Sequence, residues 1–165
     1  MKGLVSLGVF DIPKADRVSF KSGDLWRCWL KDYPGLFDAD DVRLLKEQSL
    51  RGYHYYEWRA AVLLKADFGY HSLIEKYQFK NHVGKQAIFL QRVPDGVKDL
   101  LARRKEYGNS QMPDLFAYKP DDPADWFFCE VKGGPDPVRP TQEAYFRALG
   151  IVAGKAVRLI QFRPV

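Results

Sequence analysis

The sequence predicts an α/β fold with helices in the N-terminal half and most strands in the C-terminal half. Up to Gly108, apolar residues recur at helical spacing in segments that end at glycine or proline. Two short aromatic and β-branched runs, Leu115–Tyr118 and Trp126–Val131, then flank a loop rich in proline and aspartate, which is typical of a β-hairpin. A helix over 141–149 and an apolar strand over 157–162 complete the order strand, strand, helix, strand.

The composition predicts one packed domain, because the chain has 165 residues and 46% of them are hydrophobic. Lys and Arg number 26 against 21 Asp and Glu, and the net charge of +5 favours a polyanionic partner without identifying it. Cys28 and Cys129 form no Cys-x-x-Cys motif, which argues against a structural zinc site and suits a reducing compartment. No apolar run approaches the ~20 residues that cross a bilayer. We therefore expect a cytoplasmic protein with no membrane partner.

The N-terminal segment, residues 1–21, reads as a short strand or extended arm followed by a loop. Ser22 is expected to cap a helix that ends at Pro34-Gly35, with an apolar face made of Leu25, Trp26, Trp29 and Leu30. The two tryptophans could contact a partner, but at helical spacing a role in the core is favoured.

Two further helices follow, the first with Asp38 and Asp40 as candidate caps and Gly52 as a point of interruption. The second runs from Tyr53 to about Asp67, with Gly69 as its stop. Glu57 lies in its first turn, at the edge of the apolar face. A carboxylate there could face a cleft, but the helix dipole also favours acids in a first turn, and position alone favours the dipole.

Ser72-Leu73-Ile74-Glu75 has the form of a capping box, which gives Glu75 a structural role. Residues 86–91 fit either a strand or a short helix. A helix that begins at Pro94-Asp95-Gly96 is expected to end at Gly108.

Three cations, Arg103, Arg104 and Lys105, lie in the last turns of the 94–108 helix. They could be a solvated face that suits the helix dipole, or they could contact phosphates. The sequence leaves both interpretations open.

The predicted hairpin brings acidic side chains together. If its loop is centred on Asp122, Asp114 and Glu130 are equally distant from the centre and lie directly opposite each other. Cross-strand neighbours have Cβ atoms roughly 4.5–5.5 Å apart, so the two carboxylates could share a cation. Glu130 and Lys132 are two residues apart and project from the same face of the strand, whereas Cys129 and Val131 face the other way.

These residue types suit phosphodiester hydrolysis. Mg²⁺ prefers oxygen ligands and keeps several waters, and Asp114, Glu130 and the Val131 backbone carbonyl would supply such ligands. Lys132 could position the attacking water or stabilise the pentacovalent oxyanion. The plainer interpretation is an exposed hairpin with ordinary surface charges, since neither Pro-Asp nor Glu-x-Lys is specific by itself.

The series Pro113-Asp114, Glu130-Val131-Lys132, Asp136 and Gln142 resembles the PD-(D/E)XK nuclease superfamily. More narrowly, it is similar to the VRR-NUC family, in which a Glu-Val-Lys-Gly strand is followed by a Gly/Pro loop, an aspartate and a glutamine. The resemblance covers roughly residues 53–165. It departs from the family at Gln111-Met112, where a glycine often precedes Pro-Asp, and at Pro135, which lies one position late.

The resemblance implies a restriction-endonuclease-like core, with a mixed central β-sheet flanked by α-helices and with residues 1–52 as an N-terminal helical extension packed on the nuclease domain 53–165. It implies Asp114, Glu130 and Lys132 as catalytic residues, with Gln142 on the helix beside the site. It also implies an upstream acid that binds metal, for which Glu57 is the best match and Glu75 the reserve. The cofactor would be Mg²⁺ or Mn²⁺, and Arg139 could reach a substrate phosphate.

The leading hypothesis is a metal-dependent DNA endonuclease that cuts branched, flapped or four-way-junction DNA and associates with the nucleoid. One alternative is a noncatalytic nucleic-acid-binding module on a nuclease scaffold. Another is a restriction-type enzyme in which residues 1–52 recognise sequence, although that segment has few clustered Lys and Arg. Cutting a four-way junction needs two active sites, which would suit a C2 homodimer with the Trp26/Trp29 helix as its interface.

Overall fold

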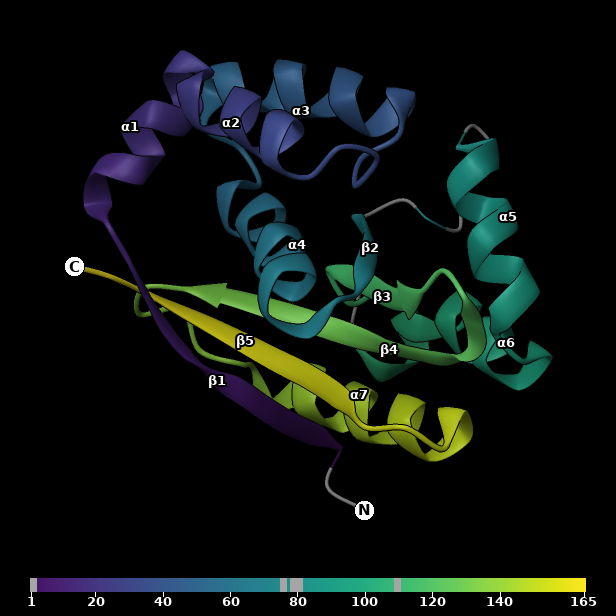
Figure 1. Cartoon of the computed structure of the whole chain (residues 1–165). Helices are drawn as coiled ribbons and strands as arrows, with labels where there is room; N and C mark the ends of the chain where they lie inside the picture. Colours follow the sequence, from purple (N-terminus) through teal and green to yellow (C-terminus); the bar gives the residue numbers. More distant parts are fainter. Residues whose placement is uncertain (1–2, 75–76, 78–81, 109–110) are drawn as a thin grey trace.

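The computed structural model describes residues 3–74, 77, 82–108 and 111–165, and it shows an α/β protein built on one five-stranded mixed sheet. In chain order the elements are β1 (Leu4–Ile12), α1 (Lys14–Ser22), α2 (Asp24–Asp32), α3 (Ala39–Arg51), α4 (Tyr55–Phe68), β2 (His71–Ile74), α5 (Val83–Arg92), α6 (Asp95–Ala102), the 3₁₀ helix η1 (Arg104–Tyr107), β3 (Leu115–Lys119), β4 (Asp122–Gly133), α7 (Pro140–Ala153) and β5 (Val157–Pro164). The strand order is β1-β5-β4-β3-β2 (Figure 1). Strands β1, β5 and β4 run parallel, whereas β3 is antiparallel to both β4 and β2. The expected α/β class and mixed sheet are confirmed.

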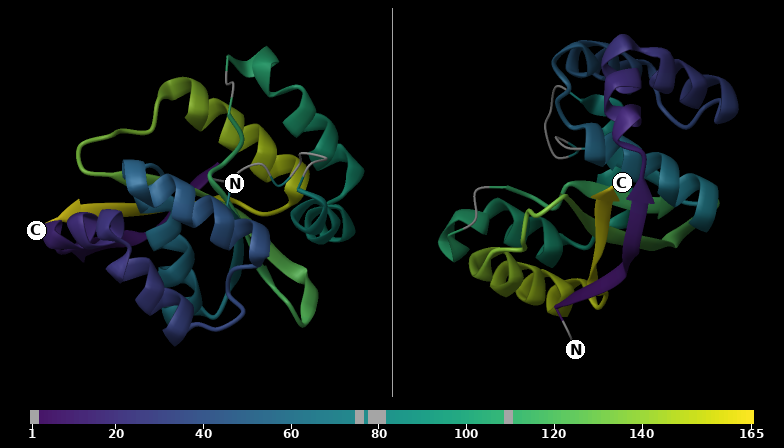
Figure 2. Two further views of the ribbon diagram at one scale, coloured as in Figure 1. Left: turned by 90° about the horizontal axis from the view of Figure 1, so that it is seen from above. Right: turned by 90° about the vertical axis from the view of Figure 1, so that its left-hand side faces the viewer.

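Helices cover both faces of the sheet. Helix α4 lies against one face with α1, α2 and α3 beyond it, and α7 lies on the opposite face (Figures 1 and 2). Successive residues of the central strand β4 enter different cores: Phe127, Cys129 and Val131 pack on the α4 side, and Phe128 packs with the helices of the other side. A strand buried on both faces is apolar throughout. A charged residue on β4 is therefore unusual and needs a specific environment.

The first twenty-odd residues differ from the sequence prediction. The strand considered for this segment exists as β1, which pairs in parallel with β5 along its length. The residues expected to form a loop instead form α1, and Ser22 ends that helix rather than capping the next one. β1 is an edge strand whose partner lies about 150 residues later in the chain, so local sequence gives little sign of it. Residues 1–52 thus contribute both helices and one sheet strand, and the domain boundary at residue 52 stays a prediction.

The middle helices agree with the sequence prediction, except that the single helix expected over 94–108 is divided into α6, which ends at Ala102, and the 3₁₀ helix η1. The Asp38 carboxylate caps α3 by accepting a hydrogen bond from the Asp41 amide at 2.7 Å. Helix α4 ends at Gly69, and η1 ends at Gly108. The segment 86–91, left open between strand and helix, is part of α5.

Two local predictions were wrong. Gly150 does not end α7, which continues to Ala153 and stops at Gly154 with φ 66°. A Cβ at Gly150 would lie 3.3 Å from the Lys155 carbonyl oxygen, so this glycine allows close packing rather than a turn. Ser72 lies in β2, so the expected capping box does not form. Glu75 lies outside the described residues.

Trp26 and Trp29 are buried in their own chain, where the Trp29 ring lies 5.9 Å from the Phe20 ring. The core role is confirmed, and the α2 tryptophans are not available as the dimer interface that the sequence suggested. A homodimer stays a prediction. No helix in the described ranges is long and apolar enough to span a bilayer.

Candidate active site

The hairpin has the predicted register. Leu115 pairs with Cys129 and Phe116 with Phe128, so the position before Leu115 faces Glu130. That position is Asp114, which lies directly ahead of β3. Its Oδ2 accepts a hydrogen bond from the Val131 amide at 2.8 Å. Strand pairing therefore fixes both the location and the orientation of the Asp114 carboxylate.

Glu130 lies in the middle of the sheet and is only 3% exposed. Its Oε1 is 3.0 Å from Lys132 Nζ and accepts a hydrogen bond from Gln142 Nε2 at 3.0 Å. Lys132, 7% exposed, also lies 3.5 Å from Asp136 Oδ2. The structure thus brings together Asp114, Glu130, Lys132 and Gln142, as the sequence predicted.

The start of α7 positions Gln142. Arg139 is the N-cap residue and Pro140 the first residue of the helix, where proline is preorganised. The Gln142 Oε1 accepts a hydrogen bond from the Arg139 amide at 3.1 Å, which leaves its Nε2 free to donate to Glu130. One amide side chain therefore caps the helix and orients a carboxylate of the site.

The two carboxylates have raised pKa values. Burial raises the pKa of Asp114 well above its usual range, and the negative charges of Glu130 and Glu57 raise it further. Burial also raises the pKa of Glu130, against the opposing charge of Lys132. Two acids thus share one lysine in a buried environment that water hardly reaches. Such a site is stabilised by any added positive charge.

Lys132 remains a cation in this environment. Burial alone would lower the pKa of Lys132, but Glu130, followed by Asp136 and Asp114, raises it above its usual value. The lysine can therefore donate hydrogen bonds and stabilise developing negative charge, but it is not suited to accept a proton near neutral pH.

Glu57 lies near this group through the packing of α4. A Cβ at Gly133 would lie 2.1 Å from Tyr56 Cε2, so only glycine lets the Tyr56 ring cross the strand directly after Lys132. The same ring stacks on Phe162 with centroids 6.0 Å apart. This contact holds the first turn of α4 over the end of β4. The Glu57 carboxylate lies 3.4 Å from His54 Nδ1 and close enough to Asp114 to raise its pKa.

The donor set fits a hard cation that keeps much of its water. No group of three or more His, Cys, Asp or Glu side chains is close enough to hold a metal ion within the part of the chain that the structure describes. Mg²⁺ is commonly held by one or two carboxylates together with waters and substrate oxygens. Asp114 and Glu130 would be those carboxylates. Participation of Glu57 and of the Val131 carbonyl stays a prediction.

The cations proposed for DNA contact lie at the end of α6 and in η1. Arg103 and Lys105 are exposed, and Arg104 is half-buried with its Nη1 donating to the Leu101 carbonyl at 3.0 Å. The Tyr107 ring of η1 lies 5.7 Å from the Tyr145 ring of α7. The end of η1 thus packs on the helix that begins at the exposed Arg139.

Sequence reasoning missed two residues of the site. The Tyr77 hydroxyl donates to the Pro113 carbonyl at 3.0 Å, which supports the turn that carries Asp114. Burial raises the pKa of Tyr77 well above its usual value, so the phenol stays a neutral donor. The other is Tyr56, whose ring covers Gly133. The Gly133-Gly134 pair signals a close backbone approach, but nothing local says which ring occupies the space.

Comparison of the chain with protein-family models, curated proteins and solved structures found no match. The assignment of function therefore rests on the chemistry of the site.

Proposed function

We propose that the protein is a Mg²⁺- or Mn²⁺-dependent DNA endonuclease of the PD-(D/E)XK type, related to the VRR-NUC family. The observation that supports this most strongly is the pair of buried carboxylates, Asp114 and Glu130, opposite each other in the predicted register with Lys132 on the same face. A net negative charge that is buried away from water raises the free energy of the folded protein unless the site takes up a cation or a proton. A divalent ion satisfies that need and is the cofactor of this chemistry.

Each residue has a distinct role in the proposal. Asp114 and Glu130 would hold the ion, which when bound lowers the pKa of a bound water and neutralises charge on the phosphoryl oxygens. The Val131 amide orients Asp114, and Gln142 orients Glu130. Lys132, kept protonated by its acidic neighbours, would position the attacking water or stabilise the pentacovalent oxyanion.

The surroundings of the site suit a nucleic-acid substrate. Arg103 and Lys105 are exposed beside η1, and Arg139 is exposed at the start of the helix that carries Gln142. η1 packs on α7, the helix that carries Gln142, so the proposal places these cations on the two elements next to the carboxylate pair. They would contact phosphates and so position the strand without reading its sequence. A preference for branched or flapped DNA is part of the proposal.

The test is cleavage of labelled single-stranded, duplex, flap and four-way-junction DNA with Mg²⁺ or Mn²⁺. We expect Glu130→Gln to lower the rate by about 10²–10³-fold or more, since it removes a ligand and its charge. Glu143→Gln makes the same chemical change on the exposed face of α7 and is expected to cut normally. Circular dichroism and a thermal melt show whether both variants stay folded.

Three outcomes would contradict the proposal: full activity of Glu130→Gln, cutting in excess EDTA, or equal loss in Glu143→Gln. DNA binding without cutting, together with no Mn²⁺ binding by calorimetry, would instead establish the noncatalytic module.

A further inference from the structure

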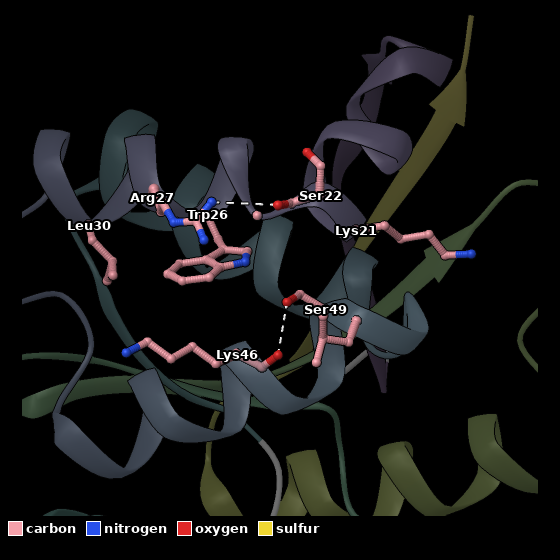
Figure 3. A pocket seen from close by; sticks show the side chains of 9 residues that line it. Lys21, Ser22, Trp26, Arg27, Leu30, Lys46 and Ser49 are labelled. Carbon is pink, nitrogen blue, oxygen red and sulfur yellow. Dashed lines mark hydrogen bonds between the residues drawn. The ribbon is translucent and has the colours of Figure 1, made fainter.

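The N-terminal helices enclose a groove of about 460 Å³ that is separate from the carboxylate pair (Figure 3). Its walls come from the end of α1, the first turns of α2 and the second half of α3. Three of its lining residues are cations: Lys21, Arg27 and Lys46. Among the described residues that line it, none is a carboxylate. Lys21 and Arg27 lie on consecutive helices, and Lys46 joins them because α3 packs against this pair.

The three cations spread along the groove. Figure 3 shows the ammonium groups of Lys21 and Lys46 at opposite ends, with Arg27 beside the Trp26 ring toward the Lys46 end. Neither lysine forms an ion pair with any acid in the described ranges, and Arg27 has only a weak, exposed pair with Asp24 at 3.8 Å. Charges arranged in a row match a ligand with repeated negative charges better than one compact anion.

The floor of the groove is polar as well as aromatic. Trp26 is 6% exposed, and its indole Nε1 has no hydrogen-bond partner among the described residues. The Arg27 guanidinium lies over the same ring, 4.8 Å from its centroid. A Cβ at Gly23 would lie 2.8 Å from Arg27 Nη1 and 3.2 Å from Trp26 Nε1, so glycine at this position leaves room for both groups. The groove therefore presents positive charge beside an aromatic floor.

We propose that this groove binds the phosphate backbone of a DNA arm next to the arm held at the carboxylate pair. The proposal rests on the proposed nuclease function, which makes DNA the polyanion, and it assigns residues 1–52 a role in holding the substrate. Backbone contacts of this kind position a nucleic acid and carry no sequence information. The N-terminal helices would thus favour substrates with more than one duplex arm.

The test is equilibrium binding of junction and duplex DNA in EDTA, where cleavage does not occur, between about 50 and 200 mM salt. The variant Lys21→Gln, Arg27→Gln, Lys46→Gln keeps the side-chain stems and removes the charges. We expect junction affinity to fall about tenfold or more, and the slope of log affinity against log salt to become shallower by about 3. The control is Lys98→Gln, Arg147→Gln, Arg163→Gln, which removes the same charge from cations that already pair with acids outside the groove.

The outcomes separate the groove from the nuclease. The wild-type protein could bind DNA, and lose affinity in the groove variant as expected, without cutting DNA in Mg²⁺ or Mn²⁺. That result would support the proposed DNA-binding groove and contradict the proposed nuclease function. If the slope of log affinity against log salt is unchanged in the groove variant, or changes equally in the control, the proposal that the groove binds DNA is wrong. Groove-dependent binding of anionic phospholipid vesicles or of polyglutamate, with no such dependence for DNA, also overturns it.

Discussion

Two buried lysine–carboxylate pairs in this molecule have the same chemistry but different surroundings. Lys85 of α5 pairs with Asp41 of α3, and its Nζ also donates to the Ile74 carbonyl at 2.9 Å. Lys132 pairs with Glu130 at 3.0 Å, but Asp114 lies opposite the same glutamate. The first pair has one acid for one lysine and a carbonyl that completes the lysine's hydrogen bonding. The second has two acids for one lysine.

The difference teaches how to distinguish a structural pair from a candidate site. The Lys85 pair links α3, α5 and the end of β2, and its charges balance, so it needs no additional ion. The Lys132 group retains an excess negative charge on the central strand of the sheet, which is stable only if a proton or a cation joins it. Burial alone is therefore a weak indicator of function. The imbalance of charge is the stronger one.

The largest effect is expected when each lysine is replaced by methionine. Lys85→Met leaves Asp41 and the Ile74 carbonyl without their partner and should lower the free energy of unfolding by about 3–5 kcal/mol. Lys132→Met should abolish most cleavage with a smaller loss of stability, because Glu130 keeps its hydrogen bond from Gln142 and Asp114 keeps its hydrogen bond from the Val131 amide. Denaturant unfolding measures the stability of both variants, and cleavage assays measure their activity. Lys98→Met, at an exposed pair with Asp95, serves as the control. Equal stability losses in Lys85→Met and Lys132→Met would contradict the distinction.

A smaller effect is expected from pH. Burial, only partly opposed by Lys85, raises the pKa of Asp41 from 3.8 to about 6. The folded state then binds more protons than the unfolded state between these values, so the contribution of Asp41 to stability is present below pH 4 and is lost as pH rises to about 6. A rise of the pKa from 3.8 to about 6 corresponds to about 3 kcal/mol. The free energy of unfolding of the wild type, measured from pH 4 to 7, should therefore fall with pH relative to that of Asp41→Asn. If the two proteins show the same pH dependence of the unfolding free energy, the pKa of Asp41 is not raised.

The smallest effect is an expected gain of stability in Asp114→Asn. Asp114→Asn removes one of two repelling buried acids, and the amide oxygen can still accept the Val131 hydrogen bond. Without metal at neutral pH we expect the free energy of unfolding to rise by about 0.5–2 kcal/mol while cleavage is lost. Asp95→Asn, at an exposed acid, should change neither. Asp114→Asn that is clearly destabilised would show that this carboxylate is held for structure rather than for a cation.

The sequence by itself determined the hairpin and what it carries. Strand parity places Lys132 on the face of Glu130, and pairing the two runs about Asp122 predicts Asp114 opposite Glu130. The structure has this register, with an irregularity between Tyr118 and Lys119 next to the turn. The helix expected over 141–149 forms as α7, and Gln142, which the family resemblance placed beside the site, lies in its first turn. These predictions are confirmed because period and loop length are properties of a few neighbouring residues.

Tertiary structure alone decided the rest. β1 became a strand by pairing with β5 at the far end of the chain, and Tyr56 came to cover Gly133 through the docking of α4. The same holds for the Lys85–Asp41 pair and for the groove of Lys21, Arg27 and Lys46, which looks like scattered charge in the printed sequence. Contacts between distant elements depend on how whole helices and strands pack, and no local pattern encodes which faces meet. The sequence specified the carboxylate pair, and packing specified the environment that makes its charge excess matter.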